Sequence, residues 1–249
     1  MYQVGIDIGS SAAKTVVLRD GEIWKTMEMA TGFSSRKTAD EIYEWLEKEQ
    51  IAGEDTRYGA TGYGRVSVPY ADKVITEITC HGKGAWKLFG RDGVVIDIGG
   101  QDTKGIVLKN GRVMKFVMND KCSAGTGKFL EVMTNRLGLT QKELSELASQ
   151  GKGVTISSMC TVFAESEVIS LIGKGTSRED IAYGVVESVA VKVAQLISQL
   201  GGNHYFLTGG LCEDEYVISR LSHALNAPVE SMPLARYAGA IGAALLSGE

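Results

Sequence analysis

One pattern occurs twice in this sequence, as VGIDIGSSAAKTVVLRDG from Val4 to Gly21 and as VVIDIGGQDTKGIVLKNG from Val94 to Gly111. Each copy reads as a short apolar strand that ends in aspartate, a glycine turn, and a second strand. The distinctive positions of the two copies coincide: Asp7 with Asp97, Gly9 with Gly99, Lys14 with Lys104, and Gly21 with Gly111. A repeat that stays in register without a gap predicts two similar halves.

The repeated turn has the chemistry of a phosphate-binding loop. Glycine lets the backbone approach an anion closely, and consecutive N–H groups in such a turn form an anion-binding nest. An aspartate at the strand end can hold Mg²⁺ through water. Two ordinary hairpins are the alternative, but the shared aspartate and lysine offsets favour phosphate binding. We expect Asp7 and Asp97 near Mg²⁺, and around the phosphates Gly9, Ser10, Ser11, Ala12, Ala13, Lys14, Gly99, Gly100 and Lys104.

The paired Asp-Ile-Gly hairpins resemble the phosphate-1 and phosphate-2 loops of the actin, sugar-kinase and Hsp70 superfamily. Its third feature, a glycine pair that holds adenosine, is matched by Gly209 and Gly210 in FLTGGLCEDEYV. The resemblance implies an α/β, two-lobed, actin/hexokinase-like (ribonuclease H-like) ATPase fold with a nucleotide cleft between the lobes. We expect a first lobe over residues 1–90 and a second over residues 91–249, with the last helix packing back on the first lobe.

Composition excludes several classes of protein. The chain has 249 residues, 44% of them hydrophobic, which is enough for a substantial core. The net charge is −4 without any basic block, so nucleic acid is not expected as a partner. No apolar run approaches the ~20 residues that span a bilayer. Met1 leads into the first strand without the features of a signal peptide. We therefore expect a cytoplasmic protein that does not bind membranes.

Strand and helix patterns follow each other along the chain, as in an α/β protein. Besides the two hairpins, strands are predicted at residues 22–28, 57–60, 112–118 and 203–208. Helices are predicted at residues 38–48, 127–137, 141–149, 161–172, 178–200, 214–225 and 237–246. Residues 72–89 are also predicted to be helical, with an interruption near Gly82 and Gly84, because glycine weakens a helix interior.

The segment DKCSAGTG is similar to a second kind of phosphate-binding loop, the P-loop. It is not a P-loop, because Cys122 replaces the first glycine and Phe129 stands where Ser or Thr should follow the lysine. Residues 123–127 read instead as a loop of small residues that opens a helix. Free N–H groups at such a helix start can bind an anion, and Gly125 and Gly127 are the candidate contacts.

The four cysteines stand far apart and form no CxxC pair. Cys122 and Cys160 each precede a helix, a position that favours the thiolate. Spacing alone leaves two interpretations open. One is buried structural cysteine, the commoner fate of an isolated thiol. The other is a symmetric dimer in which both chains contribute these two thiolates to one [4Fe–4S] cluster. Cys80 and Cys212 are interpreted as structural.

Two segments carry a closer resemblance. NDKCSAGTGKFLE and SSMCTVFAESEVISL resemble the cluster segments of the 2-hydroxyacyl-CoA dehydratase activators, which share a family with the ATPase subunits of benzoyl-CoA reductase. The likeness covers nearly the whole chain. It implies a homodimer with one [4Fe–4S] cluster held by Cys122 and Cys160 of each subunit. It also implies ATP hydrolysis in each subunit and transfer of a single electron, from ferredoxin or flavodoxin, to a partner enzyme.

The expected function is therefore an ATP-hydrolysing activator of a 2-hydroxyacyl-CoA dehydratase or a related acyl-CoA reductase. The alternatives are a small-molecule kinase of the same fold, of the N-acetylhexosamine type, and a redox-sensing nucleotide switch. The short first half contains no evident sugar-binding segment, so water is the expected phosphoryl acceptor. A polar group must orient that water, and Gln101, Asp102 and Asp7 are the candidates.

Overall fold

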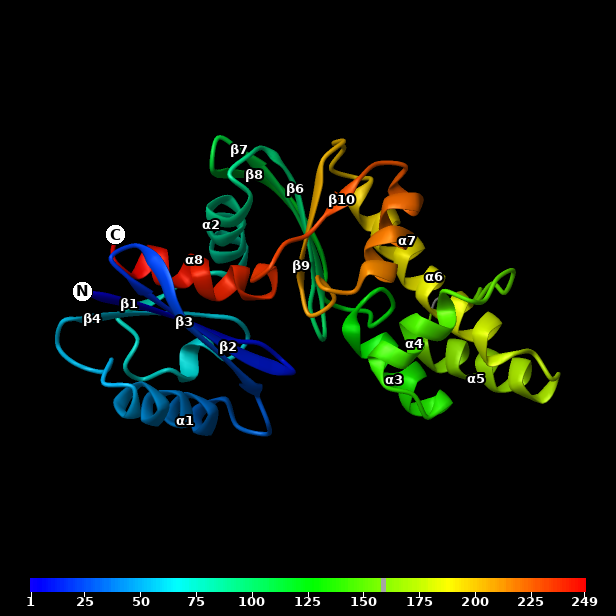
Figure 1. The fold of residues 1–249 in the computed structure, drawn as a ribbon, viewed down its shortest axis with the longest axis horizontal. Coiled ribbons are helices and arrows are strands. Elements are labelled where there is room, and N and C mark those ends of the chain that lie inside the picture. Colours follow the sequence, from blue (N-terminus) through cyan, green and yellow to red (C-terminus); the bar gives the residue numbers. More distant parts are fainter. Residues whose placement is uncertain (158–159) are drawn as a thin grey trace. The chain divides into compact units, whose positions relative to one another are not determined.

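The computed structural model describes residues 1–157 and 160–249, which form two compact units (Figure 1). Unit 1 comprises Met1–Val95, Ile106–Lys115 and Pro233–Glu249, and unit 2 comprises Ile96–Gly105 and Phe116–Met232. Along the chain, the first passage from unit 1 to unit 2 falls after Val95. The proposed lobe boundary at residue 90 stays a prediction. Ser158 and Met159, which belong to the second cysteine segment, lie outside the described residues.

The first sheet contains the first copy of the repeat. Its strand order is β3-β2-β1-β4-β5, and β1 pairs antiparallel with β2 and parallel with β4. The predicted hairpin is confirmed, and its register sets Asp7 opposite Lys14. The strands are β1 (Tyr2–Ile8), β2 (Ala12–Arg19), β3 (Glu22–Ala30), β4 (Thr56–Thr61) and β5 (Lys73–Val74).

Successive side chains of a strand point to opposite faces, so the continuous buried runs in β1 and β2 give the sheet two apolar faces. Helix α1 (Ser35–Lys48), capped by Ser34, packs Ile42 and Leu46 into one core cluster with Ile6. Helix α8 (Ala238–Ser247) shares a second cluster with Val16 and Leu18 of β2. A Cβ added at Gly5 would lie 1.8 Å from the Ala240 carbonyl oxygen, so glycine lets the backbone of α8 rest directly on β1.

Helix α2 (Glu77–Phe89) corrects one expectation. It runs without interruption through Gly82 and Gly84, preceded by the short 3₁₀ turn η1 (Arg65–Ser67) and β5. The reason is packing: a Cβ added at Gly84 would lie 1.9 Å from the Ala238 carbonyl oxygen. The contact between α2 and α8 outweighs the weak helix propensity of glycine.

The second sheet repeats the topology of the first. Its order is β10-β9-β6-β7-β8. Read from the other end, β8-β7-β6-β9-β10, this order matches that of the first sheet strand by strand. The duplication therefore covers five strands, where the sequence shows only a hairpin. The strands are β6 (Gly93–Ile98), β7 (Thr103–Lys109), β8 (Arg112–Asn119), β9 (Tyr205–Gly209) and β10 (Val229–Glu230).

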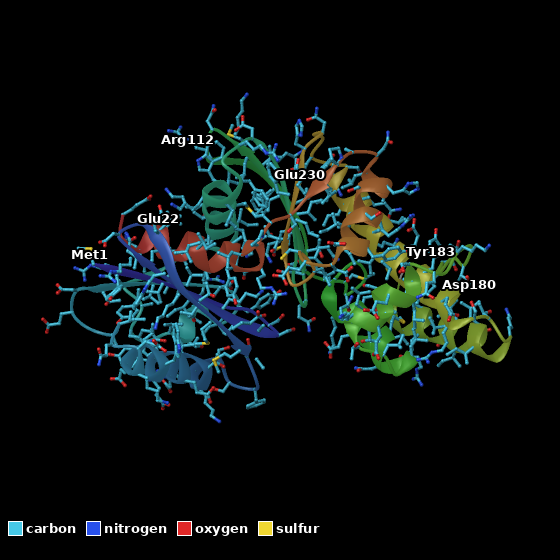
Figure 2. All side chains as sticks on the ribbon, viewed as in Figure 1. Met1, Glu22, Arg112, Asp180, Tyr183 and Glu230 are labelled. Carbon is cyan, nitrogen blue, oxygen red and sulfur yellow. The ribbon has the colours of Figure 1, made fainter. Side chains whose placement is uncertain are left out.

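Five helices of unit 2 pack together, and α6 contacts each of the other four. They are α3 (Gly127–Leu137), α4 (Gln141–Ala148), α5 (Thr161–Gly173), α6 (Arg178–Ile197) and α7 (Glu215–Leu225). Asp180 and Tyr183, labelled in Figure 2, lie on α6, and the Asp180 N–H group donates to the capping hydroxyl of Ser177. All five predicted helices are confirmed. In the described part of the chain no helix combines the length and apolar character needed to cross a bilayer.

Candidate functional site

The first glycine turn is held by loops on both sides. Asp7 is the next-to-last residue of β1 and is buried, while Ser10 and Ser11 at the tip are exposed. The Thr31 hydroxyl donates to the Gly9 carbonyl over 2.7 Å, and the Gly64 N–H group donates to the Ile8 carbonyl over 2.9 Å. Hydrogen bonds to the carbonyls of Ile8 and Gly9 therefore hold the base of the turn, while the side chains at its tip remain exposed.

The surroundings of Asp7 include residues that the sequence did not indicate. His81 of α2 places Nε2 4.0 Å from Asp7 Oδ2, and both side chains are buried. A Cβ added at Gly239 would lie 2.4 Å from Asp7 Oδ2 and 2.9 Å from His81 Nε2. Nothing in the local sequence pattern around His81 links it to Asp7, so the sequence does not indicate this contact.

The second copy contains a buried charged cluster. Asp97, Asp102 and Lys104 are only 2%, 4% and 3% exposed. Lys104 Nζ lies 2.7 Å from Asp102 Oδ1 and 3.5 Å from Asp97 Oδ2. The Thr208 hydroxyl donates to Asp97 Oδ1 over 2.8 Å. Two carboxylates thus share one ammonium in a site with little water, where ion pairs are strong and unpaired charges are costly.

This cluster changes the interpretation of two candidate residues. Lys104 was expected at the phosphates, but in this structure its ammonium is engaged by Asp97 and Asp102. Asp102 is likewise buried against Lys104, whereas Gln101 beside it is exposed. Of these two candidates for orienting water, Gln101 is therefore the more accessible.

The predicted adenosine glycines lie against the end of β6. A Cβ added at Gly209 would lie 2.4 Å from the Ile98 carbonyl oxygen, and Gly209 has φ +86°, so the position requires glycine. Gly62 stands in the same relation to Ile8, at 2.4 Å with φ +87°. Thr61-Gly62 after β4 is therefore the first-half counterpart of Thr208-Gly209 after β9, an equivalence outside the detected sequence repeat.

The loop that carries Cys122 is fastened to the second glycine turn. The N–H groups of Gly127 and Lys128 donate to the carbonyls of Gly99 and Gly100, over 2.9 and 2.8 Å. The Thr103 hydroxyl donates to the Gly125 carbonyl over 2.6 Å. This corrects the expectation that the start of α3 offers free N–H groups to an anion, because two of those groups already have carbonyl partners.

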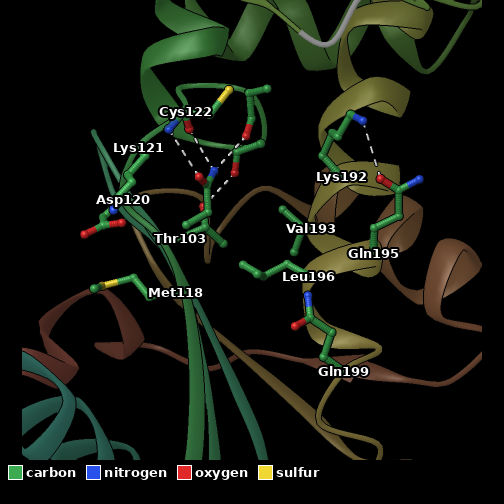
Figure 3. Close-up of a pocket in the computed structure, with 13 residues that line it drawn as sticks. Thr103, Met118, Asp120, Lys121, Cys122, Lys192, Val193, Gln195, Leu196 and Gln199 are labelled. Carbon is green, nitrogen blue, oxygen red and sulfur yellow. Dashed lines mark hydrogen bonds between the residues drawn. The ribbon is translucent and has the colours of Figure 1, made fainter.

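Both candidate ligand cysteines are exposed, and their loops are in contact. Cys122 and Cys160 are directly followed by Ser123 and Thr161, whose hydroxyl oxygens lie 2.7 Å apart. Cys122 also borders an open pocket of about 600 Å³ that α6 lines through Lys192, Val193 and Leu196 (Figure 3). The described residues contain no group of three or more His, Cys, Asp or Glu that could hold a metal ion by itself.

The other two cysteines have a different environment. Cys80 and Cys212 are buried, and burial raises the pKa of the Cys80 thiol to about 12. A thiol that stays protonated at neutral pH is a poor nucleophile and a poor metal ligand. Cys122 and Cys160 are thus the two cysteines whose thiols a ligand from outside the chain can reach.

The chain is similar to known proteins along nearly its whole length. The profile of the BadF/BadG/BcrA/BcrD ATPase family matches residues 4–247. The chain is 45% identical to the (R)-2-hydroxyglutaryl-CoA dehydratase activating ATPase of Acidaminococcus fermentans, over 98% of this chain and 96% of that protein. The solved structure of component A of that dehydratase matches with a TM-score of 0.93 and 43% identity, over 100% of both chains.

Two further solved structures are similar to this chain, one of a relative with a bound nucleotide and one of a protein that shares only the fold. The activator of the 2-hydroxyisocaproyl-CoA dehydratase from Clostridium difficile, solved with bound ADPNP, has a TM-score of 0.92 and 37% identity, over 99% of this chain and 94% of that one. A ROK family glucokinase from Streptomyces griseus has a TM-score of 0.65 at 17% identity, over 99% of both chains. The expected actin/hexokinase-like fold class is confirmed.

Proposed function

Because the chain belongs to the BadF/BadG/BcrA/BcrD ATPase family, we propose that it hydrolyses ATP to deliver one electron at low potential to an acyl-CoA enzyme. The partner is a 2-hydroxyacyl-CoA dehydratase or a related reductase component, as the names of the relatives suggest. The electron comes from ferredoxin or flavodoxin, and two copies of the chain share one [4Fe–4S] cluster.

One observation carries this proposal: the candidate nucleotide turn and the cysteine loop are directly hydrogen-bonded within unit 2. Three bonds join residues 99–103 to residues 125–128. We infer that a change in the backbone of the glycine turn would reach the loop of Cys122 through these bonds, without an intervening element. An ATPase that merely carried two exposed cysteines would not need this connection.

Each group of residues has a role in this proposal. Asp7 and Asp97 face the Mg²⁺ environment, with Ser10, Ser11 and the turn backbones around the phosphates, and Gly209 and Gly210 lie against adenosine. Gln101 orients the attacking water. Cys122 and Cys160 of each copy hold the cluster, and the exposure of both thiols allows a second chain to approach. When bound, a [4Fe–4S] cluster supplies one-electron chemistry.

The first prediction tests the choice of ligands. We expect Cys122→Ser and Cys160→Ser to give colourless protein after anaerobic reconstitution, with iron reduced to background and ADP binding unchanged. Cys80→Ser and Cys212→Ser are the matched controls, since both thiols are buried, and should keep the iron content of wild type. Iron and acid-labile sulfide assays on all four variants, with calorimetry for ADP, check this result.

Two outcomes would overturn the proposal. Full iron in Cys122→Ser would exclude that thiol as a ligand. A wild-type protein that takes up no iron and instead phosphorylates a sugar would establish the kinase alternative.

The second prediction concerns the connection between turn and loop. Thr103→Val keeps the shape of the side chain and removes the 2.6 Å bond to the Gly125 carbonyl. We expect ATP hydrolysis to stay near wild type. MgATP should change the rate at which bathophenanthroline disulfonate extracts iron, and in the variant this effect should shrink by roughly 5-fold or more, as for the loss of a typical coupling energy.

Thr134→Val is the control for this experiment. Thr134 is also a buried threonine of unit 2, but its hydroxyl bonds the Glu131 carbonyl within α3. A full MgATP effect on iron extraction in Thr103→Val would show that this bond does not connect the two sites. Equal losses in both variants would indicate a general loosening of the unit.

A further inference from the structure

Asn119, the last residue of β8, is bonded to the loop that carries Cys122. Its Oδ1 accepts a hydrogen bond from the Cys122 N–H group over 3.2 Å. Its Nδ2 donates to the carbonyls of Cys122 and Ala124, over 2.7 and 3.1 Å. Figure 3 draws these bonds as dashed lines beside Cys122. One side chain therefore fixes the backbone on both sides of the cysteine.

A second set of hydrogen bonds links this loop to Thr161, the residue after Cys160. The Thr126 N–H and hydroxyl groups both donate to the Ser123 carbonyl, over 3.0 and 2.7 Å. The Ser123 hydroxyl in turn lies 2.7 Å from that of Thr161. The residues that follow Cys122 and Cys160 are thus tied to each other within a single chain.

An exposed thiol needs such support. Cys122 and its neighbours Asp120 and Lys121 are exposed, so the position of the Cys122 thiol depends on its backbone rather than on packing. In metal sites, partners that orient the ligands are typically worth 10–100-fold in affinity.

We propose that Asn119 is a positioning residue for the Cys122 thiol, and that the Ser123–Thr161 hydroxyl pair sets the spacing between the two thiols of one chain before iron binds. The proposal rests on the proposed function in one respect, the role of these thiols as cluster ligands. The order of assembly follows: each chain presents a preformed pair of thiols, and association of two chains brings the pairs together.

The first experiment measures iron. Asn119→Ala removes all three bonds, and Asn119→Asp keeps the size of the side chain while losing both donated bonds. We expect both variants to lose iron to bathophenanthroline disulfonate roughly tenfold faster than wild type, in line with the effect of ligand-orienting groups. Asn135→Ala, at an exposed position of α3, is the matched control and should behave as wild type. The thermal midpoint and ADP affinity should stay unchanged in all three.

The second experiment needs no cluster. In the apoprotein, iodoacetamide should alkylate Cys122 several-fold faster in Asn119→Ala than in wild type, because the loop is no longer fixed. Cys160 serves as the internal reference, and Cys80 and Cys212 are buried. Peptide mass spectrometry gives the ratio of alkylation at Cys122 to that at Cys160.

The outcomes separate this inference from the proposed function. Wild-type iron retention and wild-type alkylation in Asn119→Ala would overturn the positioning role while leaving the cluster intact. Iron loss only in Asn119→Asp would show that the added charge is responsible, and would also overturn it. If wild type itself takes up no iron, the proposed function fails, and the alkylation ratio alone then decides whether Asn119 positions the thiol.

The hydroxyl pair is tested by a double-mutant cycle. Ser123→Ala and Thr161→Val should each speed iron loss, and the double variant should be no worse than the more affected single one, because both remove the same contact. Thr76 and Thr79, whose hydroxyls lie 2.8 Å apart in unit 1, are the control pair and should leave iron loss unchanged. Additive effects at Ser123 and Thr161 would exclude a shared role.

Discussion

Replacing Asp97 with asparagine is expected to lower the rate of ATP hydrolysis by roughly 10²–10³-fold, the usual cost of removing one group that stabilises charge in a transition state. The substitution is isosteric. Thr208 can still donate to the side-chain oxygen, and Lys104 still has Asp102. The fold should therefore persist while the carboxylate that we propose to lie near Mg²⁺ is lost. Steady-state phosphate release and calorimetry with ADP measure the two effects separately.

Thr208→Val is the companion variant for this prediction. It removes the 2.8 Å hydrogen bond to Asp97 but leaves the charge, so hydrolysis should fall far less than in Asp97→Asn. A wild-type rate in Asp97→Asn would place the Mg²⁺ environment elsewhere. Equal losses in both variants would mean that the orientation of the carboxylate matters as much as its charge.

Replacing Lys104 with methionine should destabilise unit 2 by about 3–5 kcal/mol, the usual cost of breaking a buried ion pair by removing one partner. The substitution leaves Asp97 and Asp102 buried near each other without the ammonium that lies between them. Part of the loss should return at acidic pH, because protonating one carboxylate removes the repulsion between like charges. Urea unfolding followed by far-ultraviolet circular dichroism measures the change.

The repeat supplies the control for this prediction. Lys14 occupies the equivalent position in the first copy and is only half-buried, so Lys14→Met should change stability by ~0.5 kcal/mol or less. Trp24, Trp45 and Trp86 all lie in unit 1, so tryptophan fluorescence follows that unit separately. A midpoint in Lys104→Met equal to that of wild type would show that the ammonium is not essential to the cluster.

The sequence was sufficient for most elements because their signals are local. Short apolar runs joined by a glycine turn indicated both hairpins, and helix periodicity indicated α3, which ends before Gly138 as predicted. The interruption assigned to α2 was wrong because intrinsic propensity ignores what approaches Gly84 from another part of the chain. That approach depends on the packing of α8, which no window around Gly84 contains.

The site shows the same limit. The two Asp-Ile-Gly turns could be read directly, since aspartate, glycine and lysine recur at fixed offsets. The equivalence of Gly62 with Gly209 could not, because it depends on how β4 and β9 pair in their sheets. The N–H groups of Gly127 and Lys128 looked available because an isolated helix start is unsatisfied; the carbonyls that satisfy them belong to Gly99 and Gly100.

The position of α8 has a consequence for biosynthesis. Unit 1 is built from segments that precede and follow unit 2 in the chain, and α8 covers the face of the first sheet that includes Val16 and Leu18. During translation, all of unit 2 is made before α8 exists, and domains tend to fold as they emerge. In the nascent chain, unit 2 can therefore fold while the apolar face of the first sheet that α8 covers is still exposed. Unit 1, which contains Asp7, is therefore completed last, and until then the face with Val16 and Leu18 stays open to non-native apolar contacts.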